Sequence, residues 1–315
     1  MRIDFRSKHM KSFSKLINKV PIIKNIMKIF TYCSSIRKNK LFKPPGHFYS
    51  PIPSLDEIRK NQDKIFGTPP KSIEGIDLNI EKQLLLLKEL LPYYNELLPY
   101  ESEKQEGLRY YYQNSEYKYS DAIILFCLMR YLKPKRIIEI GSGYSSCVML
   151  DTNEHHFDFS IENTFIDPNP QRLLRLIKPS DIKKINLITD MVQHVSPEEF
   201  SSLRENDILF IDSTHVSKTY SDVNHIIFNI LPYIAPGVYI HFHDIFYPFE
   251  YPKKWVYEGR AWNEVYLLRA FLTNNEKFEV VYMNTYMEHF YEDFFSKNMP
   301  LCLSAKGGSL WIRKK

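Results

Sequence analysis

The sequence contains no apolar run of the roughly 18 to 20 residues that a membrane-spanning helix needs. Its first residues also lack the short apolar core and the small-residue cleavage site of a secretory signal peptide. Cysteine is rare and no CxxC pair occurs, so neither a disulfide framework nor a zinc site is indicated. These absences favour a cytoplasmic globular protein with packed thiols at Cys33, Cys127, Cys147 and Cys302.

Acidic residues are almost absent from one end of the chain. Residues 1–44 carry twelve lysines and arginines against the single acid Asp4, which gives +11 and leaves −6 for the rest of a chain whose net charge is +5. Within this end, residues 10–32 place apolar side chains at helical spacing with lysines between them, and Pro21 kinks or divides the predicted helix.

Such a basic amphipathic helix can lie on the anionic inner face of a membrane. Alternatively, its apolar stripe packs on the protein's own body or on a second subunit. Nucleic acid is not an expected partner, because aromatic and basic residues do not interleave as a stacking groove requires. No feature of the sequence points to a particular oligomeric state.

Prolines and a glycine exclude regular structure from residues 43–53, which we expect to form an ordered loop. Its aromatic side chains either anchor this loop to the core or cover a pocket. Leu-rich periodicity predicts a helix over residues 79–98. A second helix is predicted over residues 120–131, with Ser120 or Asp121 as its cap.

Short β-rich runs dominate the remaining chain, mostly with helical patterns between them. They cover residues 136–140, 159–166, 185–189, 207–211, 238–242, 278–282 and 309–312. Repetition of strand, helix and strand predicts an α/β, doubly wound sheet that is mostly parallel, with helices on both faces. No clear long helix joins the last two strands, so we expect the last strand to run antiparallel. The chain is expected to comprise a basic amphipathic segment, a helical and loop extension covering the active site, and the α/β domain, at residues 1–44, 45–115 and 116–315.

The loop after the first predicted strand has the sequence Glu139-Ile140-Gly141-Ser142-Gly143-Tyr144-Ser145. Ligands bind at the carboxyl ends of the strands in such a sheet, and Gly141 and Gly143 let the backbone turn tightly beside a ligand. The third glycine of a dinucleotide fingerprint is missing, because Ser146 occupies its position. Glu139 would repel a pyrophosphate but could bind an ammonium group, directly or through water. The loop therefore favours a zwitterionic amino-acid cofactor.

This loop, with its apolar strand and the following Tyr-Ser-Ser, resembles the cofactor loop of class I S-adenosylmethionine-dependent methyltransferases. The resemblance covers roughly residues 110–315 and implies a seven-stranded Rossmann-like sheet that binds S-adenosyl-L-methionine over its first strands. It further implies cofactor contacts, of which Glu139, Gly141 and Gly143 line the methionine half. The other candidates in this loop are Tyr144 and Ser145.

Carboxylates also follow the second and third predicted strands. Asp167 can accept both ribose hydroxyls of the cofactor, or it caps the helix that begins near Pro170, and the two roles are compatible. Asp190 lies in the region that borders the adenine in this family, and the resemblance implies a cofactor contact there.

The fourth and fifth predicted strands each end with a carboxylate and a histidine. Asp212 and His215 follow the fourth strand, and His243 and Asp244 follow the fifth. These groups could bind a divalent metal or remove the proton of a hydroxyl during methyl transfer. His215 is the preferred base, because imidazole titrates near neutral pH and Asp212 or Asp244 could orient it. Alternatively, His215 caps the next helix or bonds within the end of the sheet.

The patterns IDSTH and HFHD resemble a subgroup of the superfamily that is associated with sugar, polysaccharide and natural-product modification. Its relatives include metal-dependent O-methyltransferases and cephalosporin hydroxylase-like enzymes. The metal-dependent relatives usually carry carboxylate or amide pairs where this chain has His243-Asp244. Mg²⁺ or another divalent metal at Asp212, His243 and Asp244 is therefore an alternative to a metal-free site.

We predict methyl transfer from S-adenosyl-L-methionine to a hydroxyl of a sugar or another small polyhydroxylated acceptor. The acceptor would be a lipid-linked saccharide if residues 10–32 contact a membrane. An aromatic insertion after the fifth predicted strand suits the apolar face of a sugar. The alternatives are a metal-dependent hydroxylase-like enzyme on the same fold and a non-catalytic cofactor-binding or scaffold protein.

Overall fold

The computed structural model describes residues 41–315, which belong to two compact units divided between Ile65 and Phe66. The described part of the first unit ends in helix α3 (Leu55–Ile65), whose acidic first turn and basic last turn complement the helix dipole. The predicted helix over residues 10–32 lies outside the described residues. Within residues 41–315, no helix is both long and apolar enough to span a membrane.

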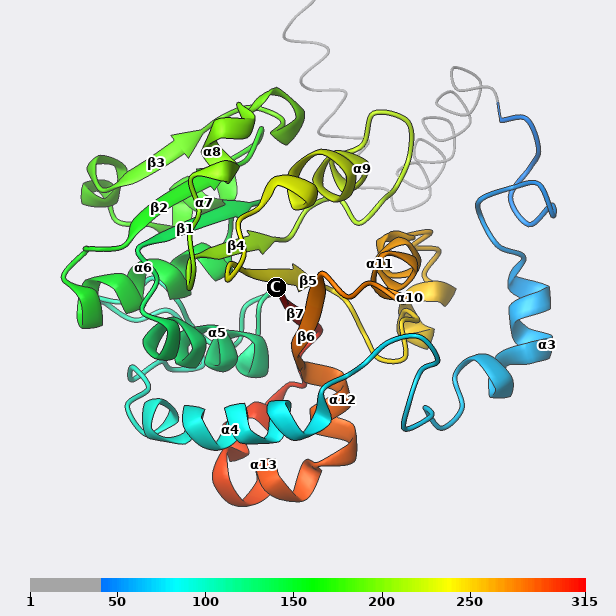
Figure 1. The fold of residues 1–315 in the computed structure, drawn as a ribbon, viewed down its shortest axis with the longest axis horizontal. Helices are drawn as coiled ribbons and strands as arrows, with labels where there is room; N and C mark the ends of the chain where they lie inside the picture. The colour runs from blue at the N-terminus through cyan, green and yellow to red at the C-terminus, as the bar shows by residue number, and fades with distance from the viewer. Residues whose placement is uncertain (1–40) are drawn as a thin grey trace, which may run out of the picture. The chain divides into compact units, whose positions relative to one another are not determined.

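The second unit is built on a seven-stranded sheet (Figure 1). Its strands are β1 (Arg136–Ile140), β2 (Glu162–Ile166), β3 (Ile185–Ile188), β4 (Ile208–Ile211), β5 (Tyr239–His243), β6 (Phe278–Met283) and β7 (Ser309–Lys314). The strand order is β3-β2-β1-β4-β5-β7-β6, and β7 runs antiparallel to both of its neighbours. All seven predicted strands are present, and the prediction of an antiparallel last strand is confirmed.

Strand β4, in the middle of the sheet, is apolar along its whole length, as expected where both faces of the sheet are covered. All four residues of β4, Ile-Leu-Phe-Ile, are buried, as is typical of a parallel strand with helices on each side. In the register of the sheet, Ile140 lies opposite both Ile166 and Ile211, and Ile211 lies opposite Phe242. Strands β1, β2, β4 and β5 therefore end level with one another, and the loops after them begin at one edge.

Helices cover both faces of the sheet. They are α4 (Ile80–Tyr94), α5 (Tyr119–Leu132), α6 (Tyr144–Phe157), α7 (Gln171–Leu176), α8 (Pro197–Ser201), α9 (Asp222–His225), α10 (Lys253–Tyr257), α11 (Glu264–Leu272), α12 (Asn284–Phe290) and α13 (Glu292–Asn298). Helix α4 packs on α5, and α5 packs on α6, on one side of the sheet, whereas α9 and α11 lie on the other side (Figure 1).

The predicted cap of α5 at Ser120 or Asp121 is wrong. The helix begins at Tyr119, and its cap residue makes no side-chain cap hydrogen bond. Ser120 donates from its hydroxyl to Glu288, and Asp121 accepts hydrogen bonds of 3.1 Å from the backbone N of Gly308. Both side chains are buried inside the first turn, so they bond to the carboxyl-terminal part of the chain rather than to their own helix.

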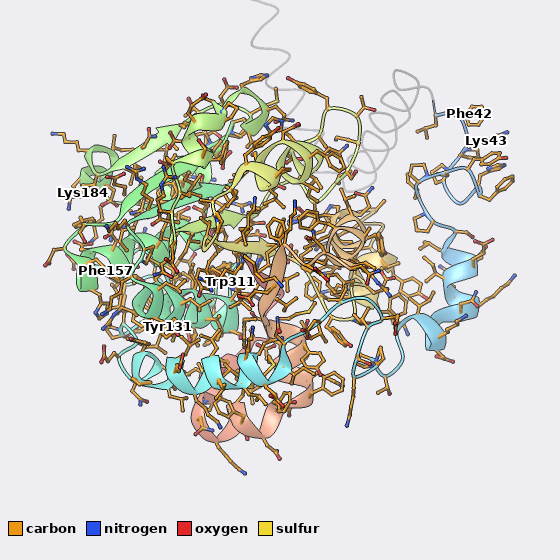
Figure 2. The ribbon with its side chains drawn as sticks, viewed as in Figure 1. Phe42, Lys43, Tyr131, Phe157, Lys184 and Trp311 are labelled. Atoms are coloured by element: carbon orange, nitrogen blue, oxygen red, sulfur yellow. The ribbon has the colours of Figure 1, made fainter. Side chains whose placement is uncertain are left out.

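The core below the site is aromatic. Trp311 on β7 is buried (Figure 2) and lies with its ring 4.7 Å from that of His241, which stacks on Phe210 at 3.8 Å. Burial holds the pKa of His241 well below its ordinary value, so the ring is neutral. The free thiols of Cys127, Cys147 and Cys302 are buried as well, which confirms the packed-thiol prediction for these three, whereas Cys33 lies outside the described residues.

One buried arginine fixes the segment ahead of α5 to the sheet domain. Arg109, 1% exposed, forms ion pairs of 2.8 Å with Asp151 on α6 and 2.5 Å with Asp181. It also pairs with the partly buried Glu154 at 2.6 Å. A buried guanidinium persists only when its donors are paired, and these three carboxylates supply the partners. The chain from Phe66 onward therefore belongs to the same unit as the sheet.

Candidate active site

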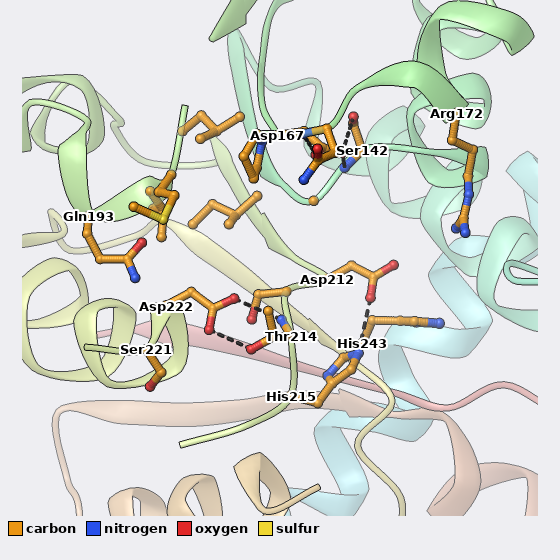
Figure 3. A pocket seen from close by; sticks show the side chains of 18 of the residues that line it. Ser142, Asp167, Arg172, Gln193, Asp212, Thr214, His215, Ser221, Asp222 and His243 are labelled. Carbon is orange, nitrogen blue, oxygen red and sulfur yellow. Dashed lines mark hydrogen bonds and ion pairs between the residues drawn. The ribbon is translucent and has the colours of Figure 1, made fainter. Parts of the chain in front are cut away.

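A cavity of about 850 Å³ opens where β1, β2, β4 and β5 end (Figure 3). This volume is in the range of small-molecule sites. The sequence-predicted site residues that line it are Gly141, Asp167, Asp212, His215, His243 and Asp244. Those that do not line it are Glu139, Gly143, Tyr144, Ser145 and Asp190.

The cofactor loop is joined to two neighbouring strand ends through its backbone. The backbone N of Gly141 donates to the carbonyl of Ile166 at 2.9 Å, and the backbone N of Asp212 donates to the carbonyl of Ile140 at 2.9 Å. Gly141 has φ +85°, a conformation that favours glycine. The loop is therefore held rigidly at the floor of the cavity.

Glu139 is buried beneath this loop. Its carboxyl group accepts hydrogen bonds from the hydroxyls of Ser145, at 2.5 Å, and Ser146. Burial raises the pKa of Glu139 to about 8, against the opposing effect of the two hydroxyls. Tyr144 turns away from the cavity, with its hydroxyl 2.9 Å from that of Tyr111. Glu139 thus fixes the first turn of α6, and its contact with an ammonium group stays a prediction.

Asp167 lines the cavity in a fixed orientation. Its Oδ2 accepts from the backbone N and the hydroxyl of Ser142, at 3.1 and 2.9 Å, and its Oδ1 accepts from the backbone N of Asn169 at 2.7 Å (Figure 3). A carboxylate offers about four lone-pair positions, so it can accept a further hydrogen bond from a ligand. The alternative role as a helix cap is not observed, because Pro170 precedes α7 and makes no side-chain cap.

Asp190 lies on the surface, away from the cavity. It accepts hydrogen bonds from the backbone N of Met191, at 2.7 Å, and from Nδ1 of His194, at 2.8 Å. The residues after it, Met191, Val192 and Gln193, line the cavity instead. The loop after β3 therefore contributes to the site through these neighbours.

His215 lies among three buried or partly buried carboxylates. Its Nδ1 is 2.8 Å from Oε2 of Glu264, and its Nε2 is 3.3 Å from Oδ1 of Asp212 and 3.5 Å from Oδ2 of Asp244 (Figure 3 shows the Asp212 contact). A ring whose nitrogens both face carboxylates can donate from both only as imidazolium. Burial would lower the pKa of His215, but the hydrogen bonds with Asp212 and Glu264 hold it well above its ordinary value. The ring therefore already carries a proton near neutral pH, which argues against its predicted role as the base.

The surrounding groups differ in acidity. Burial would raise the pKa of Asp212, but the charges of His243 and His215 outweigh it and hold that pKa below its ordinary value. For Asp244, burial prevails over the same two imidazoles and raises the pKa. His243, with Nε2 3.5 Å from Oδ1 of Asp244, has a raised pKa because the nearby aspartates outweigh its burial. Asp244 is thus the more basic of the two aspartates.

The backbone at this site is strained. His215 and Asp244 have φ angles of +60° and +57°, in the left-handed region that non-glycine residues rarely occupy. The carbonyl of His215 accepts hydrogen bonds from the backbone N of Asn263, at 3.1 Å, and of Glu264, at 3.2 Å. The start of α11 therefore fastens both the main chain and the side chain of His215.

Sequence analysis did not single out Glu264 as a functional residue. It comes 49 residues after His215 and follows no strand, so strand-end reasoning does not reach it. One signal was available: Glu264, Leu268 and Leu272 share a face of α11 and are all buried. A lone carboxylate on the apolar face of a helix indicates a buried polar partner.

The residues do not fit a divalent metal in this arrangement. Within residues 41–315, no group of three or more His, Cys, Asp and Glu side chains is placed to hold a metal ion. Nε2 of His215 occupies the space that Asp212 and Asp244 both face. The geometry therefore does not favour the alternative of a metal at Asp212, His243 and Asp244.

The chain matches a known protein family, in agreement with its strand order, its glycine loop and the polar residues at its strand ends. Residues 138–245, from β1 to the loop after β5, match the family described as a methyltransferase domain. The chain thus contains a class I S-adenosylmethionine-dependent methyltransferase domain. The Rossmann-like fold that the resemblance implied is confirmed by the seven-stranded mixed sheet of this methyltransferase.

Several known proteins are similar to this methyltransferase. An uncharacterized protein of Archaeoglobus fulgidus is 38% identical over 172 residues, which are 54% of this chain and 76% of that protein. The SAH-bound methyltransferase PaMTH1 of Podospora anserina is 15% identical, with 83% of this chain and 95% of that chain covered and a TM-score of 0.39. The SAM-bound O-methyltransferase TomG of Streptomyces achromogenes, involved in tomaymycin synthesis, is 14% identical, with 61% and 78% covered and a TM-score of 0.39. Structural similarity at this level carries no information on the acceptor.

Proposed function

We propose that this methyltransferase methylates a hydroxyl group of a sugar or another small polyhydroxylated acceptor. The observation that carries the proposal is the pair of aspartates, Asp212 and Asp244, that end neighbouring strands and line one cavity. An oxygen nucleophile loses its proton as it attacks, and a carboxylate inside the cavity can accept that proton.

The chain's own residues can hold S-adenosyl-L-methionine in this cavity. Asp167 would accept hydrogen bonds from the ribose hydroxyls, because its fixed carboxylate lines the cavity. The loop that contains Gly141 would lie under the methionine half, and Gln193 would lie near the adenine. Carboxylates outnumber imidazoles around the ends of β4 and β5. The carboxylates are those of Asp121, Asp212, Asp244 and Glu264, and the imidazoles are those of His215 and His243. This excess of negative charge favours the binding of a sulfonium cation.

The cofactor supplies an electrophilic methyl group, and the protein contributes orientation and proton removal. We assign the proton acceptor to Asp244, because it lines the cavity and is the more basic of the two aspartates. The Asp244 carboxylate would take up the hydroxyl proton while the acceptor oxygen takes the methyl group from the sulfonium sulfur of the bound cofactor. His215 and His243, each with Nε2 3.5 Å from a carboxylate oxygen of Asp244, hold Asp244 in place, so the acceptor oxygen would meet a fixed partner.

The acceptor side of the cavity combines an aromatic face with polar groups. Trp262 lines it with its ring 4.6 Å from that of His215. Thr214 donates from its hydroxyl to Asp222 at 2.6 Å, and both residues line the cavity (Figure 3). A ring face beside hydrogen-bonding groups suits a sugar. A lipid-linked sugar would be the substrate if the basic segment at residues 10–32, outside the described residues, binds a membrane.

The test combines cofactor binding with product analysis. The purified protein is incubated with methyl-labelled S-adenosylmethionine and a panel of sugars, sugar nucleotides, polyols and amines. We expect label in an O-methyl group, with Asp244→Asn slowing turnover by about 10²-fold or more while retaining cofactor affinity. Label on nitrogen would contradict the proposal. Cofactor binding without turnover would favour a scaffold, and a requirement for iron and dioxygen would favour the hydroxylase-like alternative.

A further inference from the structure

We propose that the His215 ring occupies the space between Asp212 and Asp244 in which a divalent cation would bind, so that this methyltransferase binds no metal at its active site. The inference deepens the proposed function, on which its catalytic meaning rests. The exclusion of metal itself can be measured without any acceptor.

The contacts of the ring carry the argument. Nε2 points at Oδ1 of Asp212 and at Oδ2 of Asp244, which come from the ends of adjacent strands, at 3.3 and 3.5 Å. Mg²⁺ and Mn²⁺ prefer carboxylate oxygens, so two aspartates at adjacent strand ends would be natural metal ligands. In this chain the edge of the His215 ring fills the space between them, and its Nε2 faces both carboxylates.

The other ring nitrogen of His215 contacts Glu264, a residue that the sequence alone did not indicate. Nδ1 lies 2.8 Å from Oε2 of Glu264, whose side chain is 1% exposed. This contact occupies the second nitrogen, so both ring protons have carboxylate partners. A rotation of the ring away from Glu264 would leave a buried carboxylate without its partner, so the contact opposes that rotation.

The main chain of His215 is fixed as well as its side chain. Its left-handed φ of +60° and the two hydrogen bonds from Asn263 and Glu264 to its carbonyl fix the direction in which the ring leaves the backbone. Trp262 then covers the ring at 4.6 Å. The His215 ring is therefore held in one position in the site.

During methyl transfer the fixed His215 ring would have two effects. It keeps Asp212 and Asp244 together against their mutual repulsion, and it orients Asp244 toward the acceptor hydroxyl. It supplies no open coordination position, so the acceptor is bound by the protein alone. Glu264 acts through His215 and is a positioning residue.

The experiment measures Mn²⁺ binding by calorimetry and electron paramagnetic resonance. Wild-type protein should show no saturable binding at the site, whereas His215→Ala should gain about one Mn²⁺ per chain, because two aspartates and Glu264 then face an open space. The double variant His215→Ala with Asp244→Asn should lose that site again. His194→Ala is the matched control: this surface imidazole pairs with Asp190 at 2.8 Å, and its removal should create no site.

Saturable Mn²⁺ binding by wild-type protein that Asp212→Asn abolishes would overturn the proposal, as would a His215→Ala protein that folds and gains nothing. If His215→Ala does not fold, nitrogen NMR of the wild-type histidines tests whether a metal binds at His215. The ring-nitrogen resonances of His215 should stay unchanged in excess Mg²⁺, and a metal-induced shift would contradict the inference. Failure to methylate any hydroxyl would remove the proposed function but would leave these metal-binding outcomes as they are.

Discussion

A Cβ atom added to Gly141 would stand 1.9 Å from the carbonyl oxygen of Asp212. The loops after β1 and β4 are thus in direct backbone contact at the floor of the cavity. Gly141→Ala should lower the free energy of unfolding by about 3 kcal/mol or more, because a left-handed φ and a backbone clash act together. Denaturant unfolding measures this loss.

Gly107→Ala is the control for Gly141. It has a similar φ of +89°, and an added Cβ there would have nothing within 4 Å. Its cost should be that of the backbone conformation alone, about 1 kcal/mol. Equal losses in the two variants would show that the contact between the loops does not matter.

Asp167→Ala should weaken S-adenosylmethionine binding by about tenfold or more, since a hydrogen bond to a charged group contributes about 1.5–3 kcal/mol. Calorimetric titration measures the affinity. Asp190→Ala is the matched comparison, because Asp190 lies outside the cavity and should leave the affinity unchanged. If Asp190→Ala weakened binding as much as Asp167→Ala, the cofactor contact expected at Asp190 from the sequence would stand.

Strand positions could be predicted because each strand is a local apolar run between breakers. Parallel strands end at one edge, so carboxylates after β2, β4 and β5 could be expected to meet, and Asp167, Asp212 and Asp244 do line one cavity. The protonation of His215 could not be predicted in this way, because it depends on Glu264 from a distant helix. Long-range packing likewise decided the start of α5, where burial against Glu288 replaced the expected cap.

Glu288 should make stability depend on pH. Burial raises its pKa from 4.5 to about 8, although hydrogen bonds from Ser120 and the backbone N of Gly307 oppose the shift. Between these values the folded protein holds a proton that the unfolded chain releases, so the free energy of unfolding is highest below about pH 4.5 and falls as the pH rises toward about 8. Each pKa unit of difference corresponds to about 1.4 kcal/mol.

Glu288→Gln should make this fall shallower but should not abolish it, because the amide does not titrate whereas buried Glu139, whose pKa is also raised to about 8, still does. Unfolding by denaturant across that pH range measures the slope. Glu292→Gln is the control, since Glu292 is an exposed partner of Lys306 and should leave the slope unchanged. A slope in Glu288→Gln as steep as that of the wild-type protein would show that Glu288 does not contribute to the pH dependence.

Arg109→Ala should cost about 3–5 kcal/mol of stability, because it leaves Asp151 and Asp181 buried without their cation. Thermal unfolding followed by circular dichroism measures the loss. Arg136→Ala removes an arginine from an exposed pair with Glu162 and should change stability by about 1 kcal/mol or less. Similar losses of stability in the two variants would show that the buried ion pairs of Arg109 do not anchor the segment ahead of α5.

The position of β7 between β5 and β6 has a consequence for the biosynthesis of this protein. A growing chain emerges from the ribosome amino-terminus first, so β6 is made before the only strand it pairs with in the described sheet. Until β7 is complete, β6 presents a largely apolar strand with no backbone partner, the kind of edge that associates with other chains. The nascent enzyme thus passes through a stage in which the walls of its cofactor site can already form while its sheet is open, and chaperones that shield exposed strands would act on it at this stage.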